Sequence, residues 1–298
     1  MNNPSEKNSA LFAVGVVSIL WGTTWMASKI AVRSMPALQV SGMRHLIGGG
    51  LYVGYFFLKR FPLPTKEQFI RIFWVSLIMF VLCNGFSVMS VQYIPSGLAA
   101  VVGAMSPLWV AVFGLLIFRG TKLSAITTAG LLLGFGGVLI TFYDYIEELA
   151  DTNFIFGVIY GLIASITWAL GTLLTVKDSK KLDPYYSMGW QMFLSGIMLS
   201  VFSFATNQHV PISSIGTEGW LSLAYLIVVG SVIAFMAFIY ALKRLPATQV
   251  SIHSYINPLV AIIIGDFMMN EGLTAYLVIG TIVTLLGVYL VNRGFKKV

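Results

Sequence analysis

The 298-residue sequence contains a single cysteine, Cys83, and only 10% of its residues are charged. One cysteine excludes a disulfide within the chain and a cysteine-based metal site. The three histidines, His45, His209 and His253, show no metal-ligand spacing. The chain also lacks HExxH, GxSxG, Walker A and GxGxxG motifs. We therefore expect no metal site, no cofactor and no enzyme activity.

What the sequence has in abundance is apolar residues, which make up 57% of the chain. A chain with so few polar residues cannot coat a globule with polar surface. Apolar runs of about 20 residues are long enough to span a bilayer as helices. Ten such runs are centred on residues 10–29, 38–58, 69–91, 96–118, 123–142, 154–175, 185–205, 219–240, 247–269 and 273–291. The sequence thus predicts an all-α membrane protein with ten transmembrane helices.

Basic residues are unevenly distributed between alternate loops. One set of segments carries Lys7, Lys59, Arg60, Lys66, Arg119, Lys122, Lys177, Lys180, Lys181, Lys243, Arg244, Arg293, Lys296 and Lys297. The other set carries Lys29 and Arg33 and most of the acids, including those between Asp144 and Asp151. Because Lys- and Arg-rich loops stay inside, we expect both termini to be cytoplasmic, in a cell (inner) membrane. The net charge of +7 is dispersed over short loops, which argues against a nucleic-acid partner.

The chain repeats itself at a spacing of about 150 residues. Pro95 and Pro107 recur 151 residues later as Pro246 and Pro258. At a spacing of 150, Leu123, Gly130 and Gly137 correspond to Leu273, Gly280 and Gly287. This predicts two five-helix repeats, residues 1–147 and 148–298. Because five is odd, the second repeat is inverted in the membrane, as in many secondary transporters.

Pro107 and Pro258 each lie near the middle of an apolar run. A proline within a helix leaves the carbonyl four residues upstream without its hydrogen bond, here at Gly103 and Ser254. In lipid such a carbonyl persists only against protein or water. We predict that both prolines are hinges. The alternative is a passive kink in a rigid helix.

Small residues predict close contacts between helices. The spacing Gly-x-x-x-Gly occurs at Gly50–Gly54, Gly130–Gly134 and Gly157–Gly161. Such pairs let two helix backbones approach one another closely, so we expect each of them at a helix–helix contact.

Polar and aromatic residues form stripes on several otherwise aliphatic runs. Successive stripes contain Trp21, Thr24, Trp25, Ser28 and Lys29, then Trp168, Thr172 and Thr175, then Ser187, Gln191 and Ser195, and finally Gln249, His253 and Asn257. Rings with a few polar groups are typical of small-molecule sites, and inverted repeats place such a site near the membrane midplane. We predict a substrate site that contains Trp21, Thr24, Trp168, Gln191, His253 and Asn257. Hydrogen bonding between helices of a packed core is the alternative.

Arg44 is the deepest basic residue, about seven residues into the second run. A charge buried in a membrane is costly and is a functional hypothesis by default. If Arg44 faces inward, it could attract a carboxylate together with Lys29; the alternative is that its side chain snorkels to the interface. No carboxylate lies near the middle of a run, since Asp266 is close to a helix end. Obligatory proton coupling through Asp or Glu is therefore disfavoured.

Taken together and in this order, these motifs make the chain resemble members of the drug/metabolite transporter superfamily. Within it, the chain is similar to the ten-helix exporters with two EamA-type halves. The resemblance rests on ILWGTTW at Ile19–Trp25, on Arg44, and on SPLW and NPLV around Pro107 and Pro258, and it covers nearly all of the chain. The segment around Glu271 is similar to the family's acidic turn before the last helix, whereas the first half has RGTKLS there. The resemblance implies transport, commonly outward, of amino acids, sugars, nucleotide-linked compounds or drugs.

The sequence thus predicts a secondary transporter that exports small amphipathic metabolites, such as amino acids, by alternating access across the lipid bilayer. An intramembrane enzyme and a non-transporting membrane receptor are the alternatives. Neither requires two halves of opposite orientation, so the duplication favours the transporter. The sequence sets no oligomeric state.

Overall fold

The computed structural model describes residues 4–117, 124–178, 182–245, 247–250 and 252–295. All regular structure in these ranges is helical and forms ten rods, apart from the short connecting helices η2 (Tyr143–Tyr145), η3 (Glu148–Ala150) and η4 (Ile212–Ser214). The rods are α1 (Pro4–Ala31), α2 (Ala37–Leu58), α3–η1–α4 (Lys66–Val75, Ser76–Asn84, Gly85–Tyr93), α5–α6 (Ser96–Gly103, Ser106–Ile117), α7 (Ala125–Thr141), α8 (Thr152–Asp178), α9 (Pro184–Ala205), α10–η5–α11 (Thr217–Tyr225, Leu226–Ile233, Ala234–Leu242), α12–α13 (Ala247–Val250, His253–Met269) and α14 (Ala275–Phe295). Each rod matches one predicted apolar run, which confirms the all-α fold with ten helices.

Most of these rods are long and apolar enough to cross a membrane on their own. Within the described ranges, eight meet that criterion, and the others are α2 and the interrupted rod α12–α13. Large apolar side chains such as Phe12, Leu139 and Phe267 are exposed on the outside of the bundle. Exposed apolar surface of this extent needs a partner, and lipid tails supply it around a bundle of spanning helices.

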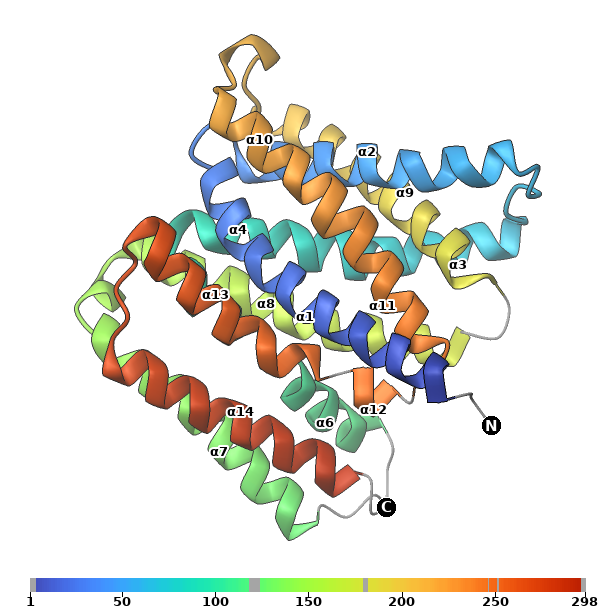
Figure 1. Cartoon of the computed structure of the whole chain (residues 1–298). Helices are drawn as coiled ribbons and strands as arrows, with labels where there is room; N and C mark the ends of the chain where they lie inside the picture. Colours follow the sequence, from blue (N-terminus) through green and yellow to red (C-terminus); the bar gives the residue numbers. More distant parts are fainter. Residues whose placement is uncertain (1–3, 118–123, 179–181, 246, 251, 296–298) are drawn as a thin grey trace.

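The rods pack in three groups (Figure 1). Helix α2 lies along α9 at one side, α7 lies along α14 at the other, and α1, α4, α8 and α13 lie between them. Equivalent rods of the two halves make equivalent contacts, because α1 packs on α13 and α11, whereas α8 packs on α5, α6 and α4. The centre of the bundle is therefore formed by helices from both halves.

The start of α1 and the end of α14 lie at the same end of the bundle (Figure 1). The acidic connection, which contains the short helices η2 (Tyr143–Tyr145) and η3 (Glu148–Ala150), lies at the opposite end. Termini at the same end agree with an even number of crossings, and a connection at the opposite end agrees with an odd number of crossings before it. Which end faces the cytoplasm stays a prediction from the loop charges.

Two rods contain π-helical segments, η1 and η5, at a spacing of about 150 residues. A π-helix shifts the backbone hydrogen bonds by one residue, and such segments are frequent at functional sites. In η5 two backbone carbonyls accept hydrogen bonds from other rods. Trp21 Nε1 donates to Gly230 O over 3.2 Å, and the Tyr52 hydroxyl donates to Val232 O over 2.8 Å. The wider turn thus ties α1 and α2 to η5.

The two mid-run prolines have different settings. Pro107 is the second residue of α6, after a turn that separates α6 from α5. The Gly103 carbonyl expected to lack a partner accepts a hydrogen bond from Ser106 Oγ over 2.6 Å. Pro258 instead lies inside the continuous helix α13, and the break in that rod precedes His253. The hinge role of both prolines stays a prediction.

Glycines bring α7 and α14 into close contact. A Cβ at Gly137 or Gly287 would come within 2.3 and 2.2 Å, respectively, of backbone nitrogens in the opposite helix. The expectation for Gly50 and Gly54 is wrong, because a Cβ would meet only a phenylalanine ring at 3.9 Å in the first case and nothing within 4 Å in the second. Gly49 makes the contact between α2 and α9, at 2.2 Å.

Candidate functional site

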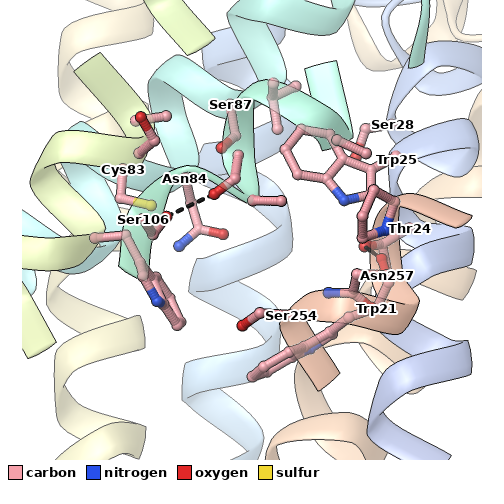
Figure 2. Close-up of a pocket in the computed structure, with 18 of the residues that line it drawn as sticks. Trp21, Thr24, Trp25, Ser28, Cys83, Asn84, Ser87, Ser106, Ser254 and Asn257 are labelled. Atoms are coloured by element: carbon pink, nitrogen blue, oxygen red, sulfur yellow. Dashed lines mark hydrogen bonds between the residues drawn. The ribbon is translucent and has the colours of Figure 1, made fainter. Parts of the chain in front are cut away.

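A cavity of about 150 Å³ lies in the centre of the bundle, between helices of both halves (Figure 2). Of the residues predicted to bind substrate, it is lined by Trp21, Thr24, Arg44, Trp168, His253 and Asn257. Polar lining residues that the prediction missed include Asn84, Ser87, Ser106 and Ser165. Asn84, Ser87 and Ser106 lie on runs for which no polar stripe was identified. Ser165 precedes Trp168 by three residues and could have been found by extending that stripe towards the start of its helix.

Aromatic rings form one wall of this central cavity. Trp21 lies edge-on to Trp168, with ring centroids 6.2 Å apart, and its centroid lies 4.9 Å from that of Phe235 and 5.1 Å from that of His253. The Trp21 side chain is only 9% exposed and is fixed by its hydrogen bond to Gly230 O. Trp168 is less buried and lines the cavity from α8. The rings present apolar area to whatever occupies the cavity.

Polar atoms in the wall are only partly satisfied. Within the described part of the chain, Asn257 Oδ1 and His253 Nδ1 are buried without a hydrogen-bond partner. A buried acceptor left unpaired costs about 1–3 kcal/mol. A donor on a water molecule or a ligand in the cavity would remove that cost. Asn257 is therefore the clearest candidate acceptor for a bound substrate.

Two of the predicted site residues lie outside the central cavity. Lys29 Nζ donates to the backbone carbonyl of Ile94 over 2.9 Å, just before α5 begins. Gln191 Nε2 donates to Ser187 Oγ over 2.9 Å, and both residues line a second cavity. Lys29 directly follows Ser28, the last residue of its stripe that lines the central cavity. On α9, Ser187 and Gln191 face the second cavity instead.

The second cavity has a volume of about 420 Å³. Its lining includes Thr65, Pro184 and Leu242, which lie at the ends of α3, α9 and α11 nearest the two chain termini. Trp168 and Phe235 line both cavities. These two rings therefore stand between the central cavity and the space towards the termini.

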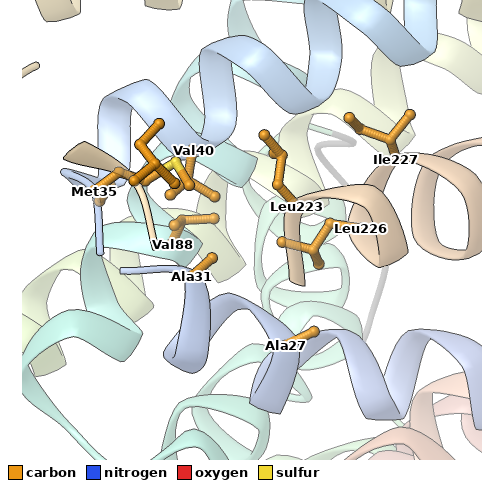
Figure 3. Close-up of a cluster of buried hydrophobic side chains, with 10 residues drawn as sticks. Ala27, Ala31, Met35, Val40, Val88, Leu223, Leu226 and Ile227 are labelled. Carbon is orange, nitrogen blue, oxygen red and sulfur yellow. The ribbon is translucent and has the colours of Figure 1, made fainter. Parts of the chain in front are cut away.

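On its other side the central cavity meets an apolar cluster (Figure 3). The cluster joins α1, α2, α4, α10 and η5, and includes Ala27, Ala31, Met35, Val40, Val88, Leu223, Leu226 and Ile227. Val88 belongs both to this cluster and to the cavity wall. Packed apolar side chains thus back the cavity wall at Val88.

A carboxylate connects three rods at that same end. Glu271, in the turn between α13 and α14, accepts hydrogen bonds from Ser96 N and Ser96 Oγ, each over 2.8 Å, and from Gly97 N over 3.2 Å. These groups form the start of α5, where a negative charge is stabilising. Lys29 of α1 interacts electrostatically with the same carboxylate. Glu271 therefore holds the turn, α5 and α1 together.

Comparisons with known proteins agree with this architecture. A model of the EamA-like transporter family matches residues 8–143 and again residues 155–293. The uncharacterized inner membrane transporter YedA of Escherichia coli (strain K12) is 30% identical, over 92% of this chain and 87% of its own length. The uncharacterized transporter YoaV of Bacillus subtilis (strain 168) is 24% identical, over 95% of this chain and 97% of its own.

A solved crystal structure has a TM-score of 0.67, and the match covers 95% of this chain and 96% of that one. At 16% identity this likeness bears on the fold alone. The family match covers both groups of five helices and nearly the whole sequence. The membrane bundle is thus a transporter, and the chain belongs to the EamA-like transporter family.

Proposed function

We propose that this protein is a secondary transporter that exports small amphipathic metabolites, such as amino acids, from the cell through its inner membrane. The observation that carries the proposal is the central cavity, which combines aromatic walls with the unpaired acceptor of Asn257. An apolar side chain would be held by the rings, and a polar group by the amide. An amino acid has both parts.

The transport mechanism in this proposal is alternating access between two inverted repeats, residues 1–147 and 148–298. The equivalent contacts of α1 and α8 support that division, as does the family model that matches twice. In this mechanism the Trp168–Phe235 pair forms the barrier on one side of the cavity, and the apolar cluster together with Glu271 forms the barrier on the other. Opening each barrier in turn would expose the site to one face of the membrane at a time.

The hydroxyl groups of the site favour transport over intramembrane catalysis. Thr24, Ser106 and Ser165 line the cavity, and each donates to a backbone carbonyl three residues earlier. A nucleophilic hydroxyl instead needs a base within hydrogen-bond reach. The relatives named above are also called transporters. A transport assay distinguishes the proposed transporter from a membrane receptor, because a receptor binds its ligand without moving it across the membrane.

The proposal is tested with the purified protein in liposomes. Counterflow of a panel of radiolabelled amino acids and other small metabolites identifies a substrate, and its affinity is then compared between variants. Trp168→Ala should weaken binding by about 1–3 kcal/mol of lost apolar burial, which is roughly a 5- to 150-fold rise in Kd. Trp74, which is 55% exposed on the outside of the bundle, provides the matched control.

Two results would refute this assignment. One is that no member of the panel is moved. The other is an equal loss of affinity in Trp168→Ala and Trp74→Ala, since a site in the central cavity cannot depend on a ring outside it. Trp21→Ala is a weaker test, because its hydrogen bond to Gly230 also supports the fold.

A further inference from the structure

Arg44 is a buried charge in the wall of the central cavity. Its side chain is 6% exposed, and Nε donates to Ser231 Oγ over 2.9 Å. A guanidinium has five N–H donors, and this is its one hydrogen bond among the described residues. The ion pairs among the described residues do not involve Arg44. They join Arg71 to Glu67 and Lys243 to Asp183. Most of the donors of Arg44 are therefore available to a ligand.

The guanidinium group lies against the π-helical segment η5. A Cβ built on Gly230 would come within 3.1 Å of Arg44 Nη2 and within 2.8 Å of Thr24 Cγ2. Glycine at this position therefore leaves room for the guanidinium beside α1. This placement also answers the snorkelling alternative, which requires an exposed head group at the interface, because the Arg44 head group points across the bundle to Ser231.

The charge of Arg44 has no counter-charge in the cavity. The described lining contains no aspartate or glutamate, and its other titratable groups are His253 and Cys83. A buried arginine without an anion is costly in a membrane protein. A carboxylate that leaves water and binds the guanidinium offsets that cost through charge-assisted hydrogen bonds. In the best geometry two such bonds form side by side. The cavity therefore favours an anion and disfavours a cation.

We propose that Arg44 is the anion subsite of the central cavity, and that the transported molecules are small carboxylates, α-amino acids included. The carboxylate binds Arg44, the apolar part lies against Trp168, and a donor such as an ammonium group reaches Asn257 Oδ1. This inference rests on the proposed function, because it names the substrate class of the same site. It differs from the expectation made from the sequence in that Lys29, bound to Ile94 O, takes no part.

The test uses matched probes that differ in charge at one position. L-Phenylalanine is compared with L-phenylalaninamide, and 3-phenylpropionate with 3-phenylpropionamide and 3-phenylpropylamine. Each probe competes in counterflow with the radiolabelled metabolite that the panel identifies, on wild-type protein in liposomes. The acids should compete roughly 10- to 100-fold better than the amides, the range expected for a charge-assisted contact, and the amine should compete least.

Variants then assign the preference to Arg44. Arg44→Gln should remove the difference between acid and amide, whereas Arg44→Lys should retain part of it because the positive charge remains. Arg33→Gln, at an exposed position near the end of α1, is the matched control and should keep the wild-type preference. Size-exclusion profiles of the purified variants check that they are folded.

If the amides or the amine compete as well as the acids on wild-type protein, the anion subsite is wrong while the transport function stands. A full acid preference in folded Arg44→Gln would overturn it as well. If no metabolite in the panel is moved, the transport proposal itself has failed and the subsite fails with it. The wild-type comparison decides the question even if Arg44→Gln does not fold.

Discussion

The contacts of Glu271 lead to a quantitative prediction about the end of the bundle that carries the acidic connection. Its carboxylate binds Ser96 N, Ser96 Oγ and Gly97 N. Ser96 is fully buried, so water cannot simply replace the carboxylate. Glu271→Ala should therefore leave two backbone N–H groups at the start of α5 without an acceptor. Glu271→Gln keeps one acceptor oxygen and the side-chain shape, and should have a smaller effect.

The size of the effect follows from those two amides. Loss of a helix cap costs about 0.5–2 kcal/mol, and each buried donor left without a partner costs about 1–3 kcal/mol. Allowing for partial relaxation, we expect Glu271→Ala to lose about 3 kcal/mol from the state in which this end is closed. If the contact forms only in that state, the population shifts towards the opposite state by roughly 100-fold, because each 1.4 kcal/mol is a factor of ten.

The single native cysteine is a ready reporter of that shift. Cys83 lines the central cavity and is buried. A membrane-impermeant methanethiosulfonate reagent added at the acidic-connection end should label Cys83 up to roughly 100-fold faster in Glu271→Ala than in wild type. Glu218→Ala, at an exposed position near the start of α10 at the same end, should label at the wild-type rate. An unchanged labelling rate in Glu271→Ala would show that the carboxylate does not hold this end closed.

Two further predictions concern topology and the prolines. Topology is tested in a Cys83→Ser background, where a cysteine in place of Glu148 should react with an impermeant outer reagent. A cysteine in place of Lys180, which lies outside the described residues, should be shielded from it. The reverse pattern would mean that the orientation is inverted. Pro107→Ala and Pro258→Ala should both leave the protein folded and slow counterflow. The effect should be larger at Pro258, because only there does alanine restore a hydrogen bond inside a continuous helix. Wild-type turnover in the double variant would rule out the hinge role.

The rods and much of the cavity lining could be read from the sequence, because lipid imposes simple rules. A helix must offer about 20 apolar residues to cross the bilayer, so the runs show where rods lie. Polar residues at helical spacing on such a run must face protein or water. Trp21, Thr24 and Asn257, identified by that argument, line the central cavity, and their contact with substrate stays a prediction. The same argument does not tell which cavity a polar helix face lines. Gln191 lines the second cavity rather than the central one.

The features that escaped sequence analysis depend on partners far away in the chain. The π-helical segments η1 and η5 are apolar like any spanning α-helix, so the sequence pattern does not show where the helix type changes. Their role emerges only when Trp21 is seen to bind Gly230 O, 209 residues away. Glu271 stood out as an acidic turn, but its contact with Ser96, 175 residues earlier, requires the folded arrangement.

The two ends of the bundle differ, and under the proposed inverted-repeat mechanism that difference sets a preferred state. Two identical halves would make the states open to either side equal in energy. Here the turn before α14 carries Glu271, whereas the corresponding RGTKLS segment of the first half has no acid and lies mostly outside the described residues. If Glu271 contributes about 3 kcal/mol to closure of its own end, it biases the equilibrium by roughly 100-fold towards that closure. The barrier at the other end consists of the Trp168 and Phe235 rings beside the larger cavity. A phenylalanine ring makes no hydrogen bond that must break when the two rings separate, so we predict that this barrier opens at lower cost. We therefore expect the protein to rest with its site directed towards the end that carries both termini.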